Sequence, residues 1–77
     1  MTGDRSIEKT LGIVIGEARQ TAGLTIQEAA DTAGMDPIVW QMIEEGLSRI
    51  DTQQLTLIAE AVRVPAEDLL RATGGIS

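Results

Sequence analysis

The sequence predicts an all-α domain of five short helices around an aliphatic core, with no β-sheet. The first observation is spacing, because apolar residues recur at the helical intervals of three and four at Leu55, Ile58, Ala59 and Val62. The second is the placement of helix start and stop signals, because glycine, proline and capping residues divide the 77-residue chain into short segments. The third is composition, since Trp40 is the only aromatic residue and aliphatic side chains must therefore supply the core.

Length and composition bound the classes of function. Residues 1–77 are expected to form one domain, ordered over about 6–73, with short flexible ends. The absence of cysteine and histidine excludes disulfides, thiol or imidazole catalysis and zinc-finger spacing, and neither cofactor nor metal is expected. No apolar run could span a membrane and the N-terminus lacks a signal sequence, so a cytoplasmic protein is expected. Twelve acidic residues against six basic ones give a net charge of −6, an unfavourable sign for binding phosphate.

The first helix is expected to begin after a cap at Ser6 and to reach about Ala22. Its core-facing stripe would be formed by Ile7, Leu11, Val14, Ile15, Ala18 and Ala22. Gly12 and Gly16 each weaken such a helix by roughly 1 kcal/mol relative to alanine. They would also let another backbone approach closely, either inside the monomer or in a second copy of the chain.

Residues 23–46 carry start and stop signals for two helices. Thr25 and Glu28 form a capping box before a helix over about 26–33, which Gly34 is placed to end. Asp36 caps a third helix over about 37–45, with Pro37 at its first position. Two short helices joined by a glycine-bearing turn are typical of a helix-turn-helix motif.

The remaining segments complete the five helices. Residues 47–51 are expected to form a loop, with Asp51 or Thr52 capping a fourth helix to about Val62. The fifth begins after Pro65, where acidic residues in its first turn suit the helix dipole. The inward side chains of the other helices are expected to be Ala29, Ala30, Ala33, Met35, Trp40, Ile43, Leu69 and Leu70.

The chain resembles the Cro/repressor type of helix-turn-helix, also called the XRE family, over about residues 11–70. The likeness is carried by Leu11, Ile15, Arg19, Gly23, Leu24, Thr25, Glu28, Ala30, Ala33, Met35, Ile43, Glu44, Gly46, Leu55, Ile58, Ala59, Val62 and Val64, with VRVPAEDLL near the end. The resemblance implies a compact lambda-repressor-like fold and a partly buried salt bridge between Arg19 and Glu44. It also implies a DNA-binding transcriptional regulator, with double-stranded DNA as its partner and the third helix in the major groove.

The resemblance also implies which residues meet DNA. Base-facing positions fall on Pro37, Ile38, Gln41 and Met42, and backbone contacts on Thr25, Ile26, Gln27 and Arg49. Among the base-facing residues only Gln41 can make a bidentate hydrogen bond, and the others could at most touch a thymine methyl. Arg49 is the one basic residue between Thr25 and Asp51, so weak DNA binding by an isolated monomer is expected, and a homodimer would double the contacts.

These departures keep a second hypothesis open. Ile26, Ile38, Val39 and Met42 could form a contiguous apolar patch, as in a helix-turn-helix scaffold that has lost DNA binding and serves as a protein interaction module or adaptor. Alternatively, Val39 and Met42 fold partly into the core and only scattered apolar residues remain exposed. Trp40 is interpreted as a core residue rather than a stacking platform.

An enzyme is not expected. Adjacent acids such as Glu44 and Glu45 point about 100° apart around a helix and cannot form a catalytic carboxylate pair.

Overall fold

The computed structural model describes residues 5–72, and the side chains of residues 8–72. Within that range the chain forms α1 (Arg5–Thr21), α2 (Ile26–Ala33), α3 (Pro37–Glu44), α4 (Thr52–Val62) and α5 (Ala66–Ala72), and no strand. The five predicted helices are thus confirmed. The ends that were expected to be flexible lie almost entirely outside the described residues. No helix in the described range is both long and apolar enough to cross a membrane.

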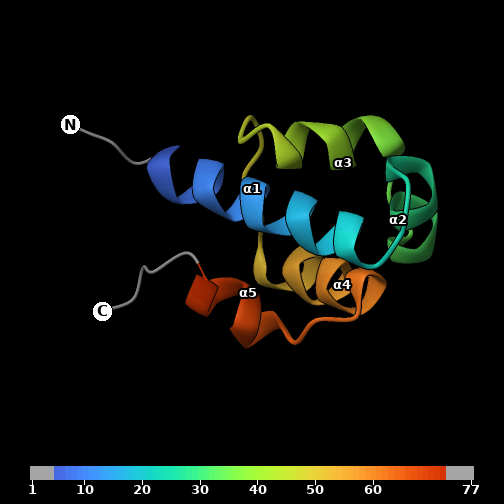
Figure 1. Ribbon diagram of the computed structural model, residues 1–77. Coiled ribbons are helices and arrows are strands. Elements are labelled where there is room, and N and C mark those ends of the chain that lie inside the picture. The colour runs from blue at the N-terminus through green and yellow to red at the C-terminus, as the bar shows by residue number, and fades with distance from the viewer. Residues whose placement is uncertain (1–4, 73–77) are drawn as a thin grey trace.

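Helix α1 lies across the middle of the molecule and separates α3 from α5 (Figure 1). Helix α3 packs on α1 and α2, whereas α5 packs on α1 and α4. Helix α2 closes one end of the bundle by packing on both α3 and α4 (Figure 1). One surface of α3 is consequently left without a covering helix in the described part of the chain.

The helix starts form by the predicted local chemistry. The Thr25 hydroxyl accepts a hydrogen bond from the Glu28 N–H at 3.0 Å, and the Glu28 carboxylate accepts one from the Thr25 N–H at 2.9 Å. Asp36 caps α3 by accepting from the Ile38 N–H at 2.8 Å. Asp51, one of the two candidates for the fourth cap, makes a capping box with Gln54. Such caps satisfy N–H groups that have no partner within the helix.

The helix ends share one hydrogen-bonding pattern. After α2, the N–H groups of Gly34 and Met35 donate to the carbonyls of Asp31 and Ala30, which is a Schellman motif. After α3, the N–H groups of Gly46 and Leu47 close the same motif, with Gly46 at a φ of +76°. Helix α4 ends in this way on Arg63, which adopts a φ of +63° that L-residues rarely take. No glycine marks that turn in the sequence.

The core is aliphatic apart from one indole. It is formed by Leu11, Ile15, Ala29, Ala30, Ala33, Trp40, Ile43, Leu55, Ile58, Ala59, Ala61, Val62 and Leu69. Trp40 is fully buried, so its interpretation as a core residue is confirmed. Met35, Val14 and Ala18 pack against this core while remaining partly exposed.

Three expectations about the helices were wrong. Ser6 cannot cap α1 because the helix already includes Arg5, and an N-cap precedes the first helical residue. Ala22 lies beyond the end of α1 and is exposed rather than inward. Leu70 is 44% exposed, because it follows the buried Leu69 on α5 and adjacent helical side chains point about 100° apart.

Candidate nucleic-acid interface

Helix α3 is held in place by a charged network with an indole as its third member. Arg19 Nε lies 2.6 Å from Glu44 Oε2, and Arg19 Nη2 donates to Glu44 Oε1 at 3.2 Å. Trp40 Nε1 donates to Glu44 Oε2 at 2.6 Å. The Arg19 and Glu44 side chains are only 12% and 14% exposed. The predicted salt bridge therefore forms, and it includes a hydrogen bond from Trp40 that the i, i+4 spacing allowed but the sequence interpretation missed.

Arg19 also connects α3 to the start of α2. Its Nη1 donates to the Leu24 carbonyl at 2.9 Å, directly before the Thr25 cap. One guanidinium thus joins the end of α1, the residue before the α2 cap and the last turn of α3. Arginine suits this role because its planar fork presents several N–H donors in a fixed geometry. The two segments expected to meet DNA are brought together through this side chain.

Two glycines let α3 lie directly on α1. A Cβ on Gly12 would overlap the Ile43 carbonyl and would lie 2.6 Å from the Glu44 carbonyl oxygen. A Cβ on Gly16 would lie 3.1 Å from Glu44 Oε1, so this position leaves room for the carboxylate of the network. Of the two roles considered for these glycines, close packing inside the monomer is the one the structure supports.

Four exposed residues of α3 and its C-cap follow helical spacing on the uncovered surface, and we call them the outer stripe: Ile38, Gln41, Met42 and Glu45. Ile38 is 67% exposed and Met42 is 39% exposed. Positions i, i+3, i+4 and i+7 lie on one side of a helix. Pro37, the remaining predicted base-facing residue, is half-buried at the N-terminus of α3. The helix thus presents three of its four predicted base-facing residues outward while Trp40 and Ile43 point into the core.

The predicted contiguous apolar patch is only partly present. Ile26 and Val39 are half-buried and pack against the core instead of extending the outer stripe. Leu47, which follows α3, is 59% exposed and donates its N–H to the Met42 carbonyl. The exposed apolar surface beside α3 is therefore smaller than the expected four-residue patch, because Ile26 and Val39 pack against the core.

The start of α2 offers backbone groups rather than charged side chains. Its Thr25 hydroxyl and Glu28 carboxylate are used in the capping box. Gln27 is exposed, and its Nε2 lies 3.4 Å from Asp31 Oδ1. The backbone N–H groups of Ile26 and Gln27 belong to the first turn, where a helix has unpaired donors and a favourable dipole for an anion.

Two basic residues lie near the C-terminus of α3. Arg49 is 92% exposed and lies 3.6 Å from Glu8 of α1. Lys9 is exposed, and its backbone and stem lie against Gly46, where an added Cβ would be 2.8 Å from Lys9 Cα. Lys9 is thus a second cation near the end of α3. Sequence reasoning missed it because residues 9 and 46 become neighbours only through the packing of α1 on α3.

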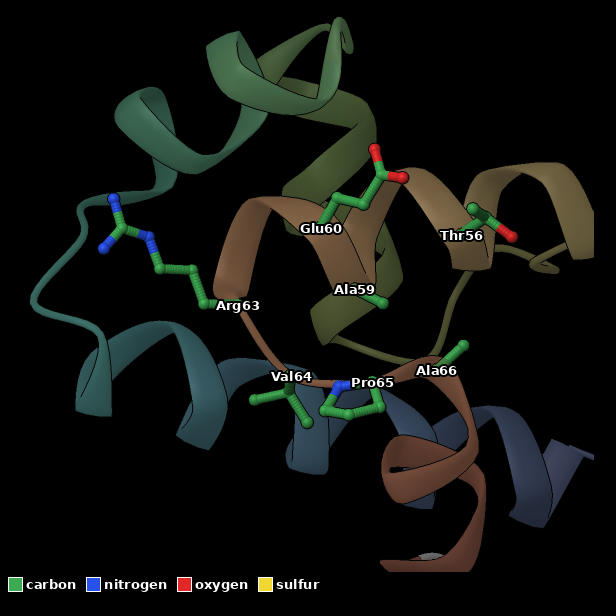
Figure 2. Close-up of a pocket in the computed structure, with 7 residues that line it drawn as sticks. All are labelled: Thr56, Ala59, Glu60, Arg63, Val64, Pro65 and Ala66. Carbon is green, nitrogen blue, oxygen red and sulfur yellow. The ribbon is translucent and has the colours of Figure 1, made fainter.

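The hollow where α4 turns into α5 does not resemble a substrate site. One hollow of about 430 Å³ lies where α4 turns into α5 and is lined by Thr56, Ala59, Glu60, Arg63, Val64, Pro65 and Ala66 (Figure 2). The Arg63 guanidinium points away from Thr56 and Ala66, so the polar groups do not converge (Figure 2). Among the described residues, no group of three metal-ligating side chains comes together.

Comparison with solved structures supports the same fold. ClgR, a clp gene regulator from Corynebacterium glutamicum, has a TM-score of 0.84 at 22% identity, with 90% of each chain covered. A second ClgR structure has a TM-score of 0.85 at 22% identity, covering 90% of this chain and 73% of that one. The restriction-modification controller protein C.AhdI from Aeromonas hydrophila has a TM-score of 0.77 at 21% identity, covering 79% of this chain and 92% of that one. No curated protein matches the chain.

The family comparison covers most of the sequence. A model described as a helix-turn-helix domain matches residues 10–72, which include α2, the glycine turn and α3. The match agrees with the resemblance identified from the residues and with the capped, glycine-joined helices of the structure. This chain belongs to the helix-turn-helix domain family.

Proposed function

We propose that this protein is a DNA-binding transcriptional regulator whose α3 enters the major groove. The observation that carries the proposal is the outer stripe, which the Arg19–Glu44–Trp40 network presents on an uncovered face of the second helix of the motif. In helix-turn-helix proteins that helix is the one placed against base edges. The similar proteins ClgR and C.AhdI are named as a gene regulator and a controller protein, which supports a regulatory role.

Backbone contacts would come from both ends of the motif. The N–H groups of Ile26 and Gln27 would hold one phosphate at the start of α2, assisted by the exposed Gln27 side chain. Arg49 and Lys9 would reach phosphates beyond the end of α3. Two cations correspond to a salt dependence of about −1.8 in log K against log salt for each domain. A monomer would therefore bind weakly, and we propose that the protein acts as a homodimer.

The remaining assignments follow from this role. We propose a cytoplasmic regulator without enzymatic activity, and the absence of convergent polar groups in the hollow between α4 and α5 supports this role.

Fluorescence anisotropy with labelled mixed-sequence duplex DNA tests the proposal. Raising the salt from about 50 mM to about 200 mM should weaken binding about tenfold per domain, since two phosphate contacts are lost to competition. Arg49→Ala should weaken binding to all sequences alike and reduce the salt slope by about one. Ile38→Ala should instead change the preference among sequences.

Arg71→Ala is the matched control. Arg71 is also an exposed arginine, but it lies on α5, on the other side of α1 from α3, and pairs with Glu67 and Asp68 (Figure 1). Its removal should leave the salt slope unchanged. Absence of DNA binding at low salt, or equal losses for Arg49→Ala and Arg71→Ala, would contradict the proposal and favour the protein interaction module instead.

A further inference from the structure

The outer stripe contains no arginine or lysine, and neither does any other position of α3. Guanine offers only acceptors, O6 and N7, on its major-groove edge, and its specific readout requires a side chain with paired donors. The stripe instead offers two apolar side chains, Ile38 and Met42, with one amide, Gln41, between them. This composition matches the major-groove edge of an A·T pair, which combines a thymine methyl with the acceptor and donor of adenine.

We propose that α3 reads A·T pairs, with Ile38 and Met42 contacting thymine methyl groups and Gln41 contacting adenine. The inference rests on the proposed function and specifies the class of operator. Ile38 and Met42 are four residues apart, which places their Cα atoms about 6 Å apart along the helix. Base pairs repeat about every 3.4 Å, so the two methyl groups belong to pairs about two steps apart.

A side-chain hydrogen bond prepares Gln41 for this contact. Gln41 Nε2 donates to Glu45 Oε2 at 3.3 Å. Because a carboxylate only accepts, this contact identifies which end of the amide is the nitrogen. The second N–H and the carbonyl oxygen of the amide remain available, and they are the donor and acceptor that adenine N7 and N6 require.

The same hydrogen bond occupies one oxygen of the side chain that could read a G·C pair instead of an A·T pair. Glu45 is the one outer-stripe residue that could accept from cytosine N4, and so select a G·C pair. Its Oε2 is already used by Gln41. The acidic Asp36 at the other end of α3 is committed to the Ile38 N–H. Each of these hydrogen bonds occupies one oxygen of its carboxylate, so enrichment of G·C pairs is the result expected if Glu45 Oε1 accepts from cytosine N4 instead.

The test begins with selection of bound sequences from a pool of random duplexes, using the full chain. Enriched sites should carry A·T pairs at two positions about two base pairs apart, with an adenine contact between or beside them. Each enriched thymine is then replaced by deoxyuridine, which removes only the C5-methyl group. Loss of one buried methyl should weaken binding roughly fourfold at each of the two positions. Replacement of any other thymine should leave the affinity unchanged.

Variants assign each methyl to its residue. In Ile38→Ala the penalty for deoxyuridine should disappear at one position, and in Met42→Ala at the other, because the partner of the methyl is gone. Gln41→Ala should lower the preference for adenine about tenfold. Leu57→Ala is the matched control, since Leu57 on α4 is 37% exposed, close to the 39% of Met42. It should retain both deoxyuridine penalties.

The outcomes separate the inference from the proposed function. Three results would overturn A·T reading without affecting the proposed DNA binding. They are enrichment of G·C pairs, an affinity that deoxyuridine does not change, and a deoxyuridine penalty that Ile38→Ala leaves unchanged. No enrichment from the pool at low salt would overturn the proposed function itself. Thermal unfolding of each variant confirms folding, and the exposure of Ile38 and Met42 predicts little change in melting temperature.

Discussion

Replacing Arg19 by alanine should destabilise the protein more than any surface substitution. The change removes both contacts to Glu44 and the hydrogen bond to the Leu24 carbonyl. It leaves a carboxylate that is only 14% exposed with Trp40 Nε1 as its remaining side-chain donor. Stranding one member of a buried ion pair costs about 3–5 kcal/mol, and the retained indole donor places this case near the lower end.

A loss of about 3 kcal/mol would be a large part of the free energy of unfolding of this domain. A domain of 77 residues is expected to have a free energy of unfolding of about 4–12 kcal/mol. The melting temperature should accordingly fall by about 12–24 °C, at about 4–8 °C for each kcal/mol in a domain of this size. Trp40, the only tryptophan, reports unfolding in a urea titration through its fluorescence. Far-ultraviolet circular dichroism provides a second signal that does not depend on the indole.

A double-mutant cycle isolates the charge pair from the lost packing. In a Glu44→Gln background the amide needs no cationic partner, so Arg19→Ala should cost only about 1 kcal/mol. The coupling between the two positions would then be about 2 kcal/mol. Equal losses in the two backgrounds, or a loss below about 1 kcal/mol in the parent chain, would refute this account of the network.

Two further substitutions test how the helices are joined. Gly12→Ala should destabilise by about 2 kcal/mol or more, because its Cβ would overlap the backbone of α3. Gly16→Ala should cost less, because its Cβ would only press on the Glu44 carboxylate and the gain in helix propensity offsets part of that contact. Chemical denaturation compares them, and similar losses would contradict the close approach at Gly12. Arg63→Gly should raise the stability by about 1 kcal/mol, because glycine adopts the φ of +63° without steric strain. Thermal unfolding measures that gain, and a lower melting temperature would show that the Arg63 side chain matters more than its backbone.

The sequence predicted those parts of the fold that depend on local chemistry. Thr25, Asp36 and Asp51 fixed the starts of three helices, because a capping side chain bonds to its own neighbours. Leu70 was misplaced because a run of two leucines does not show which one faces the core. Arg63 was missed as a turn residue because its left-handed conformation carries no compositional signal.

The candidate interface was predictable in its helix and not in its surroundings. The outward direction of Ile38 and Met42 follows from the opposite placement of Trp40 and Ile43 on the same helix. The proximity of Lys9 to Gly46 depends on how α1 crosses α3 and cannot be obtained from either segment alone. Tertiary packing also decided that Val39 joins the core.

The outer stripe supplies none of the side chains of the network that anchors α3. Anchoring comes from Arg19, Glu44 and Trp40 and from the contact at Gly12, all on the opposite side of the helix or on α1. Mutations in the outer stripe can therefore accumulate without weakening the packing of α3 on the rest of the domain. Duplicated copies of such a domain could diverge toward new target sequences one exposed residue at a time, each intermediate still folded.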